Sequence, residues 1–180
     1  MKKKIVITGA LGYLGAELCK LYSGESRYHK IIAIDDRFVS EIVNQLRNWN
    51  IEFFQVEILN KSSLQVHLED ADVVYHLAGI TDVPYVKKES NQKLDDEIKK
   101  VAIEGTNNIL ESIPKNCKII FPSTHVIFEG LKQFKNDQEC LELCSLSLSQ
   151  YKGLDLKLLV VSDILIVTYN KGTRGPYKYI

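Results

Sequence analysis

The chain has 180 residues, of which 45% are hydrophobic, and its 23 basic and 23 acidic side chains cancel at neutral pH. This length is enough for one domain with a substantial core, and the balanced charge excludes an overall field that would attract nucleic acid or an anionic membrane surface. No apolar stretch approaches the roughly 20 residues that a membrane span needs. Because the lysines of residues 2–4 lead straight into a strand-like run without a cleavable signal, we expect a cytoplasmic protein. From its length we expect one domain, residues 1–180.

The first motif along the chain is a glycine-rich turn. The strand-like run Lys4–Ile7 precedes Thr8–Gly15, in which Gly9, Gly12 and Gly15 are spaced by three. This spacing suggests a strand that turns sharply into a helix and leaves backbone N–H groups free to face a pyrophosphate. We expect Gly9 to form the tight turn, Gly12 to admit the phosphates and Gly15 to allow close packing of the helix.

A helix over residues 16–22 and a buried strand over Ile31–Ile34 would complete a βαβ unit. The strand ends in Asp35 and Asp36, and Asp35 stands about 20 residues after the last glycine, where the dinucleotide-binding fingerprint places a ribose-binding acid. A carboxylate accepts hydrogen bonds from ribose hydroxyls and repels the 2′-phosphate of NADP, so the sequence favours NAD. Arg37 either pairs with a 2′-phosphate or, as we favour, is a solvated partner of Asp36.

Strand-like and helix-like segments go on alternating along the rest of the chain. Alternation predicts an α/β fold, a doubly wound parallel sheet of the Rossmann type, with its ligand site at the carboxyl ends of the strands. We expect helices over 39–49, 62–68 and 91–113, and strands over 51–56, 73–77, 118–121, 156–161 and 164–169.

Cysteine and histidine positions give little sign of a metal site. Cys19, Cys117, Cys140 and Cys144 fit no zinc or redox spacing, so we expect free thiols in a reducing compartment. Cys140 and Cys144 could face one partner on a helix, but two further ligands are lacking nearby, and we predict no metal. His76, taken alone, is more typical of a hydrogen-bonded core histidine than of a catalyst.

The glycine-rich turn is followed along the chain by acidic residues at the ends of the second and third expected strands. Thr8–Gly15 reads TGALGYLG, Asp35 and Asp36 end the second strand, and Glu57 and Ile58 follow the third. This series resembles the extended short-chain dehydrogenase/reductase family, the NAD-dependent epimerases and dehydratases that act mostly on nucleotide sugars. The glycines match its TGxxGxxG pattern. Glu57 stands where the family usually has an aspartate before an apolar residue, a pair that contacts the adenine, and is one methylene longer.

The fourth expected strand ends in His76, Leu77, Ala78 and Gly79, which resembles the family's HLAA signature, where small residues let the backbone approach the cofactor. The resemblance covers about residues 3–130. It implies NAD as the cofactor, bound by Gly9, Gly12, Tyr13, Leu14, Gly15, Asp35, Asp36, Glu57, Ile58, Leu77, Ala78 and Gly79.

Two later segments bear on catalysis. Residues 102–106 resemble the family's NVxGT, with Ala102 in place of the asparagine that helps to organise the active site. Residues 123–130 resemble SSxxVYG, and Thr124 matches the catalytic Ser/Thr, whose hydroxyl would hydrogen-bond the substrate oxygen. The long helix, 91–113, corresponds to the family's dimerisation helix, so the resemblance also implies a homodimer.

The family's Tyr-x-x-x-Lys pair is missing. Tyr151 is the nearest candidate, but Asp155 stands four residues on, Lys152 would point to another helix face, and Lys157 lies beyond a glycine. The chain is a degenerate relative, part of a longer protein, or imperfect in this region. It also ends without the C-terminal substrate lobe of the family, so the sugar cannot be named from the sequence.

Three functions are therefore open. We favour an epimerase- or dehydratase-like oxidoreductase or isomerase that acts on a nucleotide sugar, with Thr124 and Tyr151 near the nicotinamide. The alternative is a non-catalytic NAD-binding module that senses or scaffolds. A flavodoxin-like protein that binds another phosphate ligand is less favoured because Asp35 suits a ribose.

Overall fold

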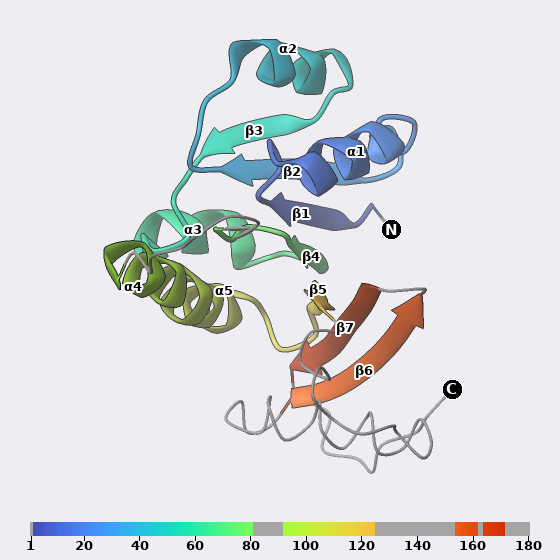
Figure 1. The fold of residues 1–180 in the computed structure, drawn as a ribbon. Coiled ribbons are helices and arrows are strands. Elements are labelled where there is room, and N and C mark those ends of the chain that lie inside the picture. The colour runs from blue at the N-terminus through green and yellow to red at the C-terminus, as the bar shows by residue number, and fades with distance from the viewer. Residues whose placement is uncertain (1, 81–91, 125–153, 162–163, 172–180) are drawn as a thin grey trace. The chain divides into compact units, whose positions relative to one another are not determined.

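The computed structural model describes residues 2–80, 92–124, 154–161 and 164–171 (Figure 1). Contacts along the chain divide it into two compact units, Met1–Pro114 and Lys115–Ile180. Among the described residues, the first unit contains the glycine-rich turn and all the helices, and the second contains three strands. One domain over residues 1–180 stays a prediction.

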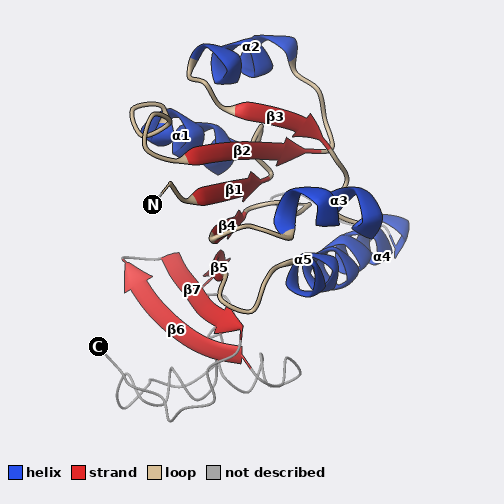
Figure 2. Cartoon of the chain, turned by 180° about the vertical axis from the view of Figure 1, so that it is seen from behind, coloured by secondary structure: helices blue, strands red, loops and turns tan. Residues whose placement is uncertain are grey.

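Four parallel strands form the sheet of the first unit. β1 (Lys4–Thr8), β2 (Lys30–Asp35), β3 (Glu52–Gln55) and β4 (Val73–His76) lie in the order β3-β2-β1-β4 (Figure 2). β1 is therefore central and pairs with β2 on one side and β4 on the other. The predicted parallel Rossmann sheet is confirmed for this unit, and the carboxyl ends of all four strands meet at one edge.

Helices cover both faces of this sheet. α1 (Tyr13–Tyr22) and α2 (Ser40–Asn48) pack on one face, where a buried cluster joins them to β1 and β2. α3 (Lys61–Leu68) follows β3, and the chain then crosses to the far side of β1, so a right-handed connection places α3 on the opposite face. The first cluster consists of Ile5, Ile7, Ala10, Leu11, Cys19, Ile31, Ala33, Val43, Leu46 and Ile51.

The predicted helix over 91–113 contains a turn that the sequence pattern did not indicate. It begins as α4 (Gln92–Lys100), continues through the π-helical turn η1 (Val101–Gly105) and ends as α5 (Thr106–Ser112). A π turn closes i→i+5 hydrogen bonds and so holds about one residue more than an α turn. No helix within the described residues is long and apolar enough to cross a membrane.

The second unit departs from the expected parallel order. β5 (Lys118–Thr124) pairs antiparallel with β7 (Ile164–Lys171), which also pairs antiparallel with β6 (Leu154–Val161). Val161 lies opposite Ile164, and only two residues separate the two strands in the sequence. Parallel strands need a crossover of a dozen or more residues, and the two residues between β6 and β7 are too few for one. The expected parallel pairing therefore does not extend to these strands.

Candidate functional site

The glycine-rich turn joins β1 to α1 and depends on two of its glycines. Gly9 has a φ of +68°, and a Cβ there would lie 2.6 Å from the backbone nitrogen of Ala78. A Cβ on Gly15 would lie 2.1 Å from the carbonyl oxygen of Gly9 and 2.7 Å from the Cα of Ala10. The predictions of a tight turn at Gly9 and close helix packing at Gly15 are confirmed.

The N-terminus of α1 faces this turn with its first N–H groups. Gly12 is the N-cap residue, and α1 has no side-chain hydrogen bond at that cap. The first N–H groups of a helix have no acceptor inside the helix, and together with the helix dipole they favour an anion. The turn is therefore suited to a phosphate group of a ligand.

Asp35 is the last residue of β2 and is buried, with 4% of its surface exposed. One carboxylate oxygen accepts the N–H of Leu11 at 2.9 Å, and the other accepts the backbone N–H and the Nε–H of Arg37, each at 3.1 Å. Burial alone would raise the pKa of Asp35, but these hydrogen bonds outweigh it and lower the pKa. Asp35 therefore stays ionised and fixes the glycine-rich turn through Leu11.

The next two residues are more open to solvent. The side chain of Asp36 is 68% exposed and that of Arg37 is 58% exposed. Arg37 Nε lies 3.1 Å from Asp35 and 3.9 Å from Asp36, so the expected pairing of Arg37 with Asp36 is present but is the longer of two. The sequence does not indicate this closer partner, because the position of Asp35 in the fingerprint points only to a ligand.

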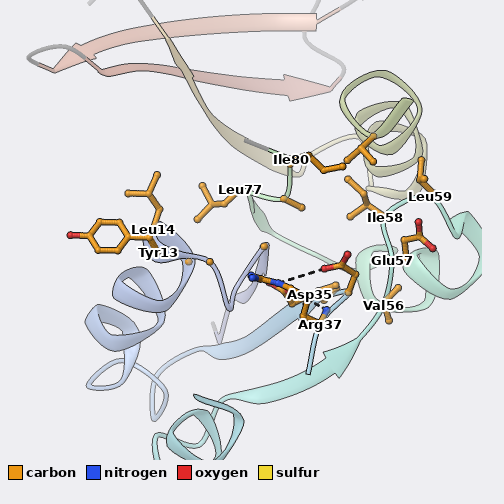
Figure 3. A pocket seen from close by; sticks show the side chains of 18 of the residues that line it. Tyr13, Leu14, Asp35, Arg37, Val56, Glu57, Ile58, Leu59, Leu77 and Ile80 are labelled. Atoms are coloured by element: carbon orange, nitrogen blue, oxygen red, sulfur yellow. Dashed lines mark hydrogen bonds and ion pairs between the residues drawn. The ribbon is translucent and has the colours of Figure 1, made fainter. Parts of the chain in front are cut away.

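A pocket of about 580 Å³ opens at the carboxyl ends of β1, β2, β3 and β4 (Figure 3). Figure 3 shows Asp35 and Arg37 joined inside it, with Leu77 to one side and Ile58 and Glu57 to the other. Every residue predicted to bind the cofactor lines this pocket. The other lining residues are Ile34, Arg37, Val56, Leu59, Ile80, Glu97 and Val101.

Glu97 and Val101 are pocket residues that lie far along the sequence from every residue predicted to bind the cofactor. They come from α4 and η1, well beyond the first βαβ units. A helix was expected in this region, but the spacing of its residues gives no sign of which face meets the pocket. A Cβ on Gly105 would lie 2.4 Å from Ile58 Cδ1, so the end of η1 presses on a residue that lines the pocket.

His76 lies beneath the pocket and is 2% exposed. Its Nδ1 is 3.1 Å from Thr8 Oγ1, and its Nε2 is 2.9 Å from Thr106 Oγ1. Burial lowers the pKa of His76 to about 4. The expectation of a hydrogen-bonded core histidine is confirmed, and its neutral ring links β1, β4 and α5.

The buried imidazole predicts a loss of stability in acid. The pKa of His76 rises from about 4 in the folded chain towards about 6.5 on unfolding, so the unfolded chain binds the proton more tightly. The contribution of His76 to the free energy of unfolding is therefore fully present well above pH 6.5 and is lost as the pH falls towards 4. Between pH 7 and pH 5, His76 should lower the free energy of unfolding by about 2 kcal/mol, as measured by urea denaturation.

The control for this prediction is His76→Gln, which has no titrating ring and should lose that part of the pH dependence. Burial also lowers the pKa of His67, which acts in the same direction in both proteins. The difference between wild type and variant therefore isolates His76. An NMR titration in which the His76 ring protonates near pH 6.5 would contradict the prediction.

The two predicted catalytic residues are not part of this pocket's described lining. Thr124 is the last residue of β5, in the second unit, and Tyr151 lies outside the described residues. The catalytic assignment of both stays a prediction. Among the residues that the structure describes, Cys19 and Cys117 are buried, and no group of His, Cys, Asp and Glu could hold a metal; Cys140 and Cys144 lie outside.

The model of the 3-beta hydroxysteroid dehydrogenase/isomerase family matches residues 6–154. The chain belongs to the extended short-chain dehydrogenase/reductase family. This confirms the resemblance drawn from the glycine-rich turn and the acids after β2, and it overturns the flavodoxin-like alternative.

Relatives of known name in the extended short-chain dehydrogenase/reductase family agree. UDP-N-acetyl-alpha-D-glucosaminuronate decarboxylase of Bacillus cytotoxicus is 28% identical, over 78% of this chain and 43% of its own length. CDP-paratose 2-epimerase of Salmonella typhi is 30% identical, over 78% of this chain and 43% of its own length. The chain thus spans less than half the length of these relatives.

A solved structure confirms the fold. UDP-glucose-4-epimerase from Stenotrophomonas maltophila, determined with bound NAD and formylated UDP-arabinopyranose, matches with a TM-score of 0.61 at 14% identity. The match covers 84% of this chain and 50% of the epimerase. At that identity the likeness supports the Rossmann fold of the extended short-chain dehydrogenase/reductases and nothing finer.

Proposed function

We propose that the pocket at the carboxyl ends of β1 to β4 binds NAD. The observation that carries this proposal is that one cavity is lined by the glycine-rich turn, the ionised Asp35 and the ends of β3 and β4. The N-terminus of α1 would hold the pyrophosphate, Asp35 the adenosine ribose, and Glu57 with Ile58 the adenine. NAD supplies an acceptor for a hydride when it is bound.

The hydrogen bonds of Asp35 fit a ribose, provided that Arg37 moves. A carboxylate offers about four acceptor positions, and Leu11 and Arg37 take three of them. A ribose diol needs two. The guanidinium of Arg37 is the group that can leave, because its side chain is 58% exposed and flexible, whereas the N–H of Leu11 is fixed in the turn.

We further propose that the whole protein is an NAD-dependent enzyme acting on a nucleotide sugar. Support comes from the family and from relatives whose names specify UDP- and CDP-linked sugars. The alternative is an NAD-binding module without turnover. It is favoured by one specific observation, the acid Asp155 where the family has a lysine four residues after the tyrosine.

Calorimetric titration with NAD and NADP tests the binding proposal. NAD should bind at least about tenfold more tightly, because the 2′-phosphate would meet Asp35 and Asp36. Equal affinities, or a preference for NADP, would show that Arg37 reads a 2′-phosphate. No binding of either nucleotide would reject the site.

Turnover separates the enzyme from the module. The chain is incubated with NAD and, in turn, UDP-, CDP- and dTDP-linked sugars, and nicotinamide reduction and sugar epimerisation are followed. Turnover that Tyr151→Phe abolishes supports the enzyme. Tight NAD binding without turnover for any of these sugars supports the module.

We also propose that the protein is cytoplasmic and forms a homodimer through α4, η1 and α5. Ile103, in η1, is 53% exposed, which suits a helical contact with a second copy. Sedimentation equilibrium that gives a monomer at all concentrations would reject the dimer.

A further inference from the structure

We propose that His76 is a positioning residue of the NAD pocket, which it shapes by holding two of its walls through the hydroxyls of Thr8 and Thr106. The inference rests on the proposed NAD function and adds a residue that does not itself line the pocket. The first wall is the end of β4, Leu77 and Ala78. The second is formed by α4 and η1, which contribute Glu97 and Val101.

The first wall is held against the glycine-rich turn by Thr8. Its carbonyl oxygen accepts the N–H of Leu77 at 3.1 Å, and its hydroxyl accepts the N–H of Ala78 at 3.3 Å. Gly9 packs so tightly on the same two residues that a Cβ would lie 2.6 to 2.7 Å from their backbone atoms. The position of Thr8 therefore sets where the Leu77–Ala78 backbone lies along the pocket.

The hydrogen bonds of His76 determine the tautomer and the charge of its imidazole ring. Because Thr8 Oγ1 accepts from Ala78, its own hydrogen is free to point at His76 Nδ1, 3.1 Å away. Nδ1 then accepts, and the remaining ring hydrogen lies on Nε2, which donates to Thr106 Oγ1 at 2.9 Å. The chain of hydrogen bonds runs in one direction, from Ala78 through Thr8 and His76 to Thr106, and needs a neutral ring.

The second wall is held through Thr106. This residue begins α5 directly after η1, so its bond to His76 fixes the point from which η1 and α4 extend along the pocket. Its neighbour Gly105 is in close contact with Ile58, which leaves little freedom for the end of η1 to slide. Loss of the Thr106 bond should therefore loosen Glu97 and Val101, although neither touches His76 in any described hydrogen bond.

Hydroxyl-deleting variants test the proposal without removing the buried ring. Thr8→Val and Thr106→Val keep the shape and lose the hydroxyl, while Thr8→Ser and Thr106→Ser restore it. Ser112→Ala is the matched control, because Ser112 is buried on the same α5 and donates its hydroxyl to the carbonyl of Asn108, and neither residue lines the pocket. Stability is followed by urea denaturation in every variant.

Two measurements then decide. Both valine variants should weaken NAD binding about three- to tenfold, the serine variants should restore it, and Ser112→Ala should not change it. Thr106→Val should also speed hydrogen exchange of the backbone amide of Ala78, which is linked to Thr106 through Thr8 and His76. Ser112→Ala should not change this exchange rate.

The outcomes separate this inference from the proposed function. If Thr106→Val loses stability as Ser112→Ala does but keeps its NAD affinity, the positioning role is overturned and NAD binding stands, whether or not exchange at Ala78 changes. If the wild type binds no NAD, the proposed function fails. Exchange at Ala78 in Thr106→Val then still shows whether His76 couples the two walls.

Discussion

Replacing Gly15 by alanine is expected to lower the free energy of unfolding by about 3 kcal/mol and to weaken NAD binding by at least about tenfold. The added Cβ would lie 2.1 Å from the Gly9 carbonyl oxygen and 2.7 Å from Ala10 Cα, and backbone cannot rotate away as a side chain can. α1 must therefore move away from the glycine-rich turn, and this movement displaces the N–H groups at its N-terminus that are proposed to bind the pyrophosphate. Urea denaturation and calorimetry measure the two effects.

Gly24→Ala is the matched control. A Cβ on Gly24 would meet no atom within 4 Å, so the same substitution there should leave both stability and NAD affinity within about 1 kcal/mol of wild type. A Gly15→Ala protein as stable as the Gly24→Ala protein would show that the turn can relax. The packing role given to Gly15 would then be wrong.

Replacing Asp35 by alanine should cost about 1.5–3 kcal/mol of NAD affinity, because a charged acceptor for the ribose is lost. It should also destabilise the chain, since the N–H of Leu11 loses its acceptor at 2.9 Å. Calorimetry gives the first quantity and urea denaturation the second.

Asp36→Ala supplies the comparison, because Asp36 lines the same pocket but its side chain is 68% exposed. Its loss should change NAD affinity less than threefold, within about 0.6 kcal/mol, and leave stability nearly unchanged. A larger loss of affinity for Asp36→Ala than for Asp35→Ala would move the ribose site to Asp36.

The first βαβ unit could be predicted because its signals are local. The spacing of Gly9, Gly12 and Gly15 and the acid at the end of β2 act within one short stretch of chain, and residues at the carboxyl ends of parallel strands must meet. The same topological rule brought Glu57 and Leu77 to the pocket. The positions of these residues depend on the order of strands and helices, which can be predicted from the sequence pattern.

Other features could not be predicted because they depend on contacts between distant residues. The spacing of α4 gave no sign that Glu97 faces the pocket, since that depends on the docking of α5 against β4 and Ile58. Arg37 paired more closely with Asp35 than with Asp36 because the buried carboxylate is the better-fixed acceptor. The antiparallel pairing of β6 and β7 depends on which residues of the two strands lie opposite each other, and the apolar runs do not reveal that register.

The π turn at Val101–Gly105 also bears on how the chain should be aligned with its family. A π turn accommodates about one residue more than an α turn, so the helices on either side keep their faces when that residue is gained or lost. Deletion of one residue within Val101–Glu104 would convert the turn to ordinary helix while Thr106 still reaches His76 and Glu97 still faces the pocket. Single-residue gaps between this chain and other family members are therefore expected to fall here.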